Sequence, residues 1–127
     1  MMQAANSVSG VVVDAAMKVH SALGPGLLES AYVACLAHEL RRRGVGVDVQ
    51  VPVPLVYEGV RLDVACRIDM LVERLVVVEA KTVEKILPVH IAQLLSYLRL
   101  GGCPIGLLFN FHAPHLRDGI RRLIRPA

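Results

Sequence analysis

The sequence contains no tryptophan, and aromatic residues make up only 4% of its 127 residues. A core without large rings has to be built from Val, Leu, Ile and Ala, and the chain has enough of them because 54% of its residues are hydrophobic. Charged residues make up 20%, which indicates a folded globular chain and not a disordered one. The length fits one domain, and we predict a single domain over residues 1–127.

Cysteine is scarce as well. Cys35, Cys66 and Cys103 lie far apart and are odd in number. This spacing argues against a disulfide framework, and it offers no four-cysteine zinc or iron–sulfur motif. We expect each cysteine to be a small buried hydrophobic residue in a reducing compartment.

Long hydrophobic runs are also missing. No uninterrupted apolar stretch approaches the roughly 20 residues that a membrane-spanning helix requires. Asp14 and Lys18 interrupt the apolar N-terminal stretch, which lacks a basic start, so we expect no signal peptide. We therefore predict a cytoplasmic protein with no membrane partner. Its net charge of +3 permits binding to a polyanion without requiring it.

Hydrophobic periodicity divides the chain into helices and strands. Helices are predicted over residues 9–23, 27–43, 89–100 and 116–124. Strands are predicted over residues 47–57, 62–72, 75–81 and 105–111. Three consecutive strands, then a helical crossover to a fourth, predict an α/β fold with a mixed central sheet flanked by helices.

Two of the predicted strands carry further signals. Pro52 and Pro54 interrupt the first strand, and proline favours an edge position or a bulge. The run from Leu75 to Val78 indicates a strand that is buried on both faces.

Asp69 and Glu79 are acids inside or directly after apolar strands, where a carboxylate is unfavourable unless it is paired or metal-bound. If the hairpin loop has an odd number of residues, for example residues 73–75, the two acids fall opposite each other on one face. Carboxylates facing each other across a strand pair repel, and a divalent cation would remove that repulsion. A two-residue loop would put them on opposite faces. The simpler interpretation of Glu79 is a salt bridge with Lys81, which shares its face.

Glu29 is a third acid on an apolar surface. It lies on the same helical stripe as Val33, Leu36 and Leu40, so it projects toward the core. It also lies in the first helical turn, where the positive helix end favours an anion, and charge complementation alone could explain it. Gln93 and Tyr97 lie on the polar face of a later helix, which either faces solvent or looks into the same cleft as the acids.

Other polar side chains have simpler interpretations. His20 lies near the apolar stripe of the first helix, and we expect it to be a packing residue. Arg117, Arg121, Arg122 and Arg125 fall on one side of the last predicted helix. They could follow a phosphate backbone, with a solvated charged face as the alternative.

Taken together, these segments resemble the PD-(D/E)XK nuclease superfamily, and within it the GxxExxY branch. The motif segments are residues 26–32 (GLLESAY), 67–72 (RIDMLV), 79–81 (EAK), 90–98 (HIAQLLSYL), 106–111 (GLLFNF) and 119–122 (GIRR). The ordered set of acid, acid, ExK and QxxxY is more specific than ExK alone. The resemblance covers nearly the whole chain, and it implies an αβββαβ core with an extra N-terminal helix.

The resemblance also implies the chemistry. Asp69, Glu79 and the Ala80 carbonyl would bind Mg²⁺, for which Mn²⁺ would substitute, and Glu29 would ligate directly or through water. Lys81 would orient or activate the attacking water, and Gln93 and Tyr97 would complete the site. The implied activity is hydrolysis of nucleic-acid phosphodiester bonds, with DNA as the expected partner.

Three hypotheses follow. The first is a magnesium-dependent nuclease. The second is a catalytically silent nuclease-fold module that binds nucleic acid or a partner protein. The third is a structural homodimer whose acids are neutralised by Lys81 and Arg67.

Overall fold

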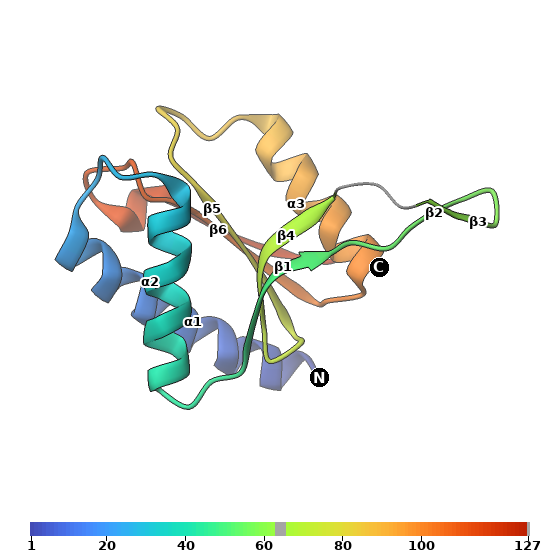
Figure 1. Ribbon diagram of the computed structural model, residues 1–127, viewed down its shortest axis with the longest axis horizontal. Helices are drawn as coiled ribbons and strands as arrows, with labels where there is room; N and C mark the ends of the chain where they lie inside the picture. The colour runs from blue at the N-terminus through green and yellow to red at the C-terminus, as the bar shows by residue number, and fades with distance from the viewer. Residues whose placement is uncertain (63–65, 127) are drawn as a thin grey trace.

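The computed structural model describes residues 1–62 and 66–126 and contains one five-stranded sheet with helices on both faces (Figure 1). The elements are α1 (Met2–Leu23), α2 (Glu29–Arg42), β1 (Val47–Pro52), β2 (Leu55–Tyr57), β3 (Val60–Leu62), β4 (Arg67–Val72), β5 (Val76–Lys81), α3 (Pro88–Gly101), β6 (Ile105–Asn110), the 3₁₀ turn η1 (Leu116–Gly119) and β7 (Ile120–Ile124). No helix among the described residues is long and apolar enough to cross a membrane.

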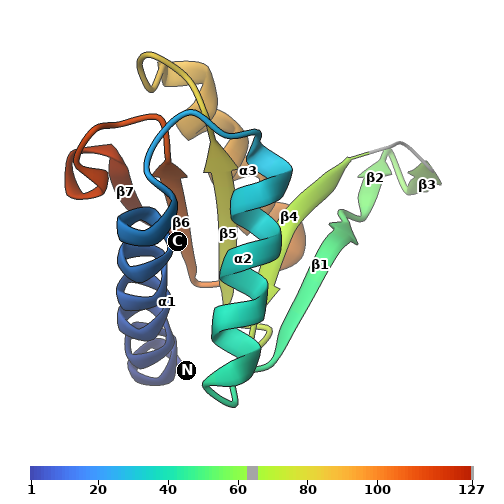
Figure 2. The same cartoon turned by 60° about the vertical axis from the view of Figure 1, so that its left-hand side comes forward.

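The strand order in the large sheet is β1-β4-β5-β6-β7. Only β5 and β6 are parallel, and they are joined by the crossover helix α3, so the sheet is mixed. Helices α1 and α2 lie side by side on one face, and α3 covers the other (Figure 2). This arrangement confirms the predicted α/β fold, including the additional N-terminal helix.

Strand β5 lies at the centre of the sheet and is buried on both faces, as its apolar run predicted. Val76, Val78 and Ala80 pack against α1 and α2, whereas Val77 packs in the core beneath α3. Because side chains alternate along a strand, Glu79 shares the α3 face with Val77. Strand β5 therefore contributes to the apolar cores on both faces of the sheet and also carries Glu79.

Tyr32 closes the connection between α1 and α2. Its hydroxyl donates to the Gly24 carbonyl at 2.5 Å and accepts from the Leu27 amide at 3.2 Å. Its ring stacks on Phe111 with 4.4 Å between centroids. Gly24 and Gly26 have φ values of 68° and 109°, which glycine adopts readily. One buried side chain thus fixes the turn that leads into Glu29.

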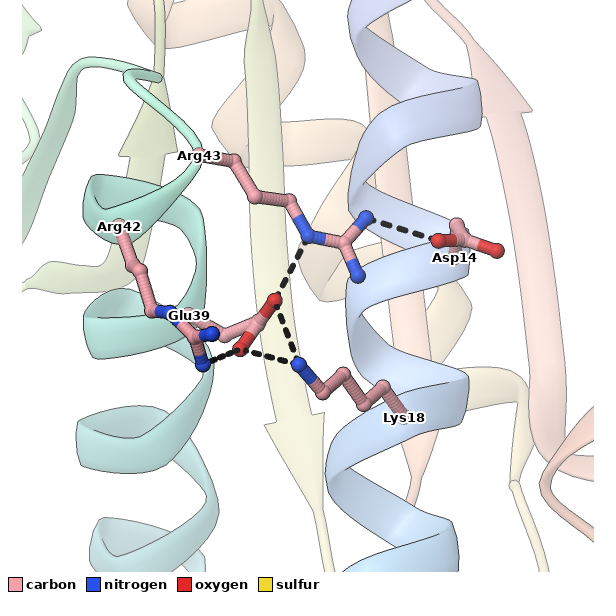
Figure 3. Close-up of polar contacts among 5 residues, drawn as sticks. All are labelled: Asp14, Lys18, Glu39, Arg42 and Arg43. Carbon is pink, nitrogen blue, oxygen red and sulfur yellow. Dashed lines mark hydrogen bonds and ion pairs between the residues drawn. The ribbon is translucent and has the colours of Figure 1, made fainter.

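An ion-pair cluster joins the C-terminal end of α2 to the middle of α1 (Figure 3). Glu39 lies 3.2 Å from Lys18 Nζ and 2.8 Å from Arg43 Nε, and Arg43 also reaches Asp14 at 2.8 Å. The hydrogen bond from Arg43, followed by that from Lys18, holds the pKa of Glu39 below its usual range. The two N-terminal helices are therefore joined by these ion pairs and, at their connection, by Tyr32.

The edge strand β1 was predicted correctly, but the segment 47–57 is divided. Strand β1 ends at Pro52, and Leu55–Tyr57 pairs instead with Val60–Leu62 in a separate hairpin that projects from the body of the molecule (Figure 1). The break follows from the two prolines, which cannot donate to a ladder. Part of the predicted strand 62–72, residues 63–65, lies outside the described residues.

The C-terminal prediction was wrong. Residues 116–124 were expected to form a basic helix, but they form η1 and strand β7, which pairs antiparallel with β6. The free edge of β6 offers backbone partners that outweigh the weak local helical pattern, a tertiary effect invisible in the local sequence. Arg121 and Arg122 consequently alternate on a strand and do not share one side.

Three smaller predictions also need correction. Helix α1 begins at Met2 and not at residue 9, so Ser9 is buried within the helix. Helix α2 begins at Glu29, two residues later than predicted. Cys35 is exposed, because its helix position faces outward, and only Cys103 is buried as expected. His20, in contrast, is buried, with Nε2 2.9 Å from the Ala113 carbonyl oxygen, which confirms a packing role.

Candidate functional site

The β4–β5 hairpin aligns the two strand acids. Glu73, Arg74 and Leu75 separate the strands, and Val72 pairs with Val76, Leu71 with Val77 and Met70 with Val78. The same register sets Asp69 opposite Glu79. Glu73 and Arg74 have φ values of 51° and 54°, which lets this short loop reverse the chain. The loop is odd in number, so the predicted juxtaposition of the two acids is confirmed.

The carboxylates of Asp69 and Glu79 replace part of the sheet ladder. Strand pairing ends at Met70 and Val78, where β4 turns away from β5 (Figure 2). Beyond that point the Asp69 amide donates to Glu79 Oε1 at 3.1 Å, and the Ala80 amide donates to Asp69 Oδ2 at 2.8 Å. Each acid therefore accepts a hydrogen bond from the opposite strand's backbone, and this fixes both side chains at the splayed end.

Glu79 is only 4% exposed. Burial, followed by the negative charge of Asp69, raises the pKa of Glu79 to about 8. Loss of hydration penalises the charged form of a carboxyl, and a second acid nearby adds to that penalty. The ion pairs between described residues include neither Glu79 nor Asp69. Two carboxyl groups thus lie together without an ion pair to a described cation, and ionising both of them is unfavourable.

Lys81 does not neutralise Glu79. Its Nζ donates to Gln93 Oε1 of α3 at 3.1 Å, and its charge only lowers the pKa of Glu79 as a lesser effect. Arg67 likewise donates to the Gln50 carbonyl at 3.3 Å. Within residues 1–62 and 66–126, the predicted salt bridges from these two cations to the strand acids are not formed.

Gln93 and Tyr97 of α3 lie on the side of the sheet that carries Glu79. Gln93 contacts Lys81 directly by accepting its hydrogen bond. Burial raises the pKa of the Tyr97 hydroxyl, and the charge of Glu79 raises it further. Of the two interpretations of this helical face, the structure therefore supports the one in which it looks toward the acids.

Glu29 approaches from the opposite face of the sheet. It begins α2, and its Oε1 accepts a hydrogen bond from the Thr82 amide, just beyond β5, at 3.3 Å. Glu29 and Asp69 line one open cleft of about 500 Å³, and its other lining residues are Leu28, Ser30, Val33, Gln50 and Thr82. The acid predicted from the helical stripe thus reaches the end of the strand that carries Glu79.

The three acids are neighbours but do not form a closed ligand set. Among the described residues, no three His, Cys, Asp or Glu side chains are grouped closely enough to hold one ion between them. Asp69 is the link, because it exchanges hydrogen bonds with the strand of Glu79 and shares the cleft with Glu29. A site that used all three would need Glu29 to move toward the pair or to act through water.

Sequence reasoning missed three residues at this site. Thr82 contributes a backbone amide, so its side chain carried no signal. Gln50 faces Asp69 in the register that pairs Val49 with Met70 and Val51 with Ile68, and its φ of 52° interrupts β1 there. Asn110 ends β6 and is buried, and a lone amide after an apolar strand was the signal that could have identified it.

A family model described as the PD-(D/E)XK nuclease superfamily matches residues 6–123. The chain belongs to this superfamily. No curated protein and no solved structure matches it. Members of the PD-(D/E)XK superfamily generally use divalent metal ions, and membership implies a nuclease-like function and binding to nucleic acid.

A second, larger cavity lies beside the acid cleft of this PD-(D/E)XK chain. Its volume is about 790 Å³, and its lining includes Gly26, Lys85, Asn110 and Arg121. None of the acids Glu29, Asp69 and Glu79 lines it. The acid cleft, though smaller, is lined by Glu29 and Asp69, and Asp69 is hydrogen-bonded to the strand that carries Glu79, so this region is the candidate site.

Proposed function

We propose that this chain is a magnesium-dependent nuclease of the GxxExxY branch that hydrolyses phosphodiester bonds in nucleic acid, with DNA as its substrate. One observation carries the proposal: Asp69 and Glu79 face each other across a strand pair, Glu79 is largely removed from water, and no cation of the described residues forms an ion pair with either. A divalent cation relieves that repulsion and matches the preference of Mg²⁺ for carboxylate oxygens. Mn²⁺ has similar ligand preferences and is the expected substitute.

In this proposal each residue has a defined role. Asp69, Glu79 and the Ala80 carbonyl hold the metal ion, and Glu29 ligates it directly or through a water molecule. The bound ion would lower the pKa of a water molecule and neutralise phosphate charge. Lys81 orients the attacking water, and Gln93 of α3 accepts a hydrogen bond from Lys81 Nζ and so restrains this ammonium group. Tyr97 closes the site from α3.

The test compares Glu79→Gln and Asp69→Asn with wild type on labelled single-stranded and duplex DNA and RNA. Both substitutions keep an oxygen that can accept the backbone hydrogen bonds, so the fold should survive. Loss of the negative charge should lower Mg²⁺-dependent cleavage by at least about a hundredfold, a factor typical of the loss of a catalytic group. Glu58→Gln is the matched control, because Glu58 lies in the exposed turn of the β2–β3 hairpin.

Full cleavage activity in either folded variant would eliminate this mechanism. Cleavage of RNA but not of DNA would retain the mechanism and correct the substrate.

The alternative is a catalytically silent module that binds nucleic acid or a partner protein. The separation of Glu29 from the strand acids favours it, because the three side chains do not form a ready-made ligand set. Calorimetry distinguishes the two. The nuclease should bind Mn²⁺ in a manner abolished by Glu79→Gln and should cleave nucleic acid. The module would bind nucleic acid or a partner without turnover.

A further inference from the structure

Asn110 is a buried polar residue at the end of β6, with an exposure of 4%. Its side-chain Nδ2 donates to the Val83 carbonyl at 2.8 Å, and its Oδ1 accepts from the Val83 amide at 3.1 Å. The same oxygen accepts from the His112 amide at 3.2 Å. The carboxamide thus pairs with both polar groups of one residue, as a neighbouring strand would.

The bonds of Asn110 hold the chain where it leaves β5. In the parallel register Asn110 lies beside Lys81, and the Phe111 amide donates to the Lys81 carbonyl at 2.9 Å. Lys81 and Val83 are therefore both fixed by residues at the end of β6. Thr82 lies between them, and its amide is the donor that meets Glu29 Oε1. The position of this amide is set from both sides.

We propose that Asn110 is a positioning residue for Glu29, acting through Val83 and the Thr82 amide. The positioning of Glu29 by Asn110 is independent of the proposed function, and only its effect on cleavage rests on that function. The side-chain hydrogen bonds of Asn110 within the described part of the chain go to Val83 and His112, not to an acid. It holds the one described backbone donor to which Glu29 is bonded, and that donor keeps the α2 acid beside the strand that carries Glu79.

Only a carboxamide suits this arrangement. It presents a donor and an acceptor side by side, which match the carbonyl and amide of Val83. Alanine would leave buried backbone groups unpaired, and such groups are costly. Aspartate would keep the acceptor but place its charge against the Val83 carbonyl. The two variants therefore weaken the contact to different degrees, with Asn110→Asp keeping the size of the side chain.

The direct test needs no catalysis. We expect Asn110→Ala to accelerate hydrogen exchange of the Thr82 and Val83 amides in the metal-free protein by at least about tenfold, because lost hydrogen bonds lower the free energy of local opening. Amides in the middle of β5 should exchange as in wild type. Asn110→Asp should give an intermediate acceleration, and it serves as the working variant if the alanine variant fails to fold.

The functional test is a double-mutant cycle. Loss of a residue that orients a metal ligand typically weakens metal affinity or activity by about tenfold or more, so Asn110→Ala should raise the Mn²⁺ concentration for half-maximal cleavage by that factor. Glu29→Gln removes the ligand on which Asn110 acts. In that background Asn110→Ala should have less than about a twofold further effect, because coupled residues are non-additive.

Val12→Ala is the control for general destabilisation. Val12 is buried where α1 packs on the sheet and does not line the acid cleft, and the smaller side chain leaves a cavity. The Val12→Ala substitution should lower the free energy of unfolding and leave the Mn²⁺ concentration for half-maximal cleavage unchanged. Fully additive losses in the cycle, or unchanged Thr82 exchange in Asn110→Ala, would overturn the inference. Failure of Glu79→Gln to reduce cleavage would instead overturn the proposed function, while the exchange experiment would still decide the role of Asn110.

Discussion

At the scale of single residues, the dominant feature is a carboxyl group held away from water. Glu79 has a folded-state pKa of about 8, whereas its ordinary value is 4.5. Burial is the larger cause, and Asp69 is the next. A buried acid that resists ionisation indicates either a proton or a cation as its natural partner.

This shift predicts how stability depends on pH. Because the folded-state pKa of Glu79 lies above the unfolded one, its protonation favours folding. The contribution of protonated Glu79 to the free energy of unfolding is complete below about pH 4.5 and is lost as the pH rises through about 8. In metal-free buffer, the free energy of unfolding should therefore fall between these limits. Urea unfolding of wild type and Glu79→Gln across this range measures the effect.

The amide variant provides the control. A glutamine side chain cannot ionise, so the decrease should be largely absent in Glu79→Gln, and the remaining slope reports all other groups. Parallel pH profiles for the two proteins would contradict the prediction and would mean that Glu79 is ionised in the folded state at neutral pH.

At the scale of elements, the α1–α2 connection sets where Glu29 stands. The hydroxyl of Tyr32 binds both ends of this turn, while its ring packs on Phe111. The tyrosine of the GLLESAY segment is therefore a structural residue, and it positions Glu29 only through the turn that it closes.

Tyr32→Phe tests this role. It removes the two hydrogen bonds and retains the ring stacking. The free energy of unfolding should fall by about 1 kcal/mol, the usual net contribution of a buried hydrogen bond. Urea denaturation measures it, with Tyr57→Phe on the exposed hairpin as the control. Equal stability of wild type and Tyr32→Phe would show that the turn is held by its glycines and backbone alone.

The elements also show what the sequence could and could not predict. The odd number of residues in the loop between β4 and β5 was enough to predict that Asp69 lies opposite Glu79, because side chains alternate regularly along each strand. The helical stripe correctly pointed Glu29 inward. Thr82 and Gln50 could not be identified, since one acts through its backbone and the other through a register with β4 that the sequence does not specify. Strand β7 was missed because it exists only where β6 offers an edge.

At the scale of the whole molecule, two apolar cores lie on opposite faces of one sheet. The central strand β5 contributes to both, and helices from each face reach its carboxyl end: α2 with Glu29 and α3 with Gln93. The candidate site therefore lies where the layers meet and depends on all of them.

This sharing predicts cooperative unfolding of a single domain. The three tyrosines report on different regions, namely Tyr32 in the α1–α2 core, Tyr57 on the hairpin and Tyr97 beside the acids. With no tryptophan to dominate the signal, tyrosine fluorescence and far-ultraviolet circular dichroism should give one coincident urea transition, as two-state domains of this size do. Separate midpoints would divide the chain into independently unfolding parts.

The hydrogen bonds from the Asp69 and Ala80 amides have a consequence for how the sequences of such chains change in evolution. Asp69 and Glu79, the two acids of the proposed site, also hold strands β4 and β5 together, because each side-chain oxygen substitutes for a missing ladder partner. A related chain without the proposed nuclease activity would still need an oxygen at both places, and Asn or Gln would supply it. Among related chains, a side-chain oxygen kept at these two positions indicates a structural requirement. An acid kept at both positions, which the fold disfavours, indicates an active site.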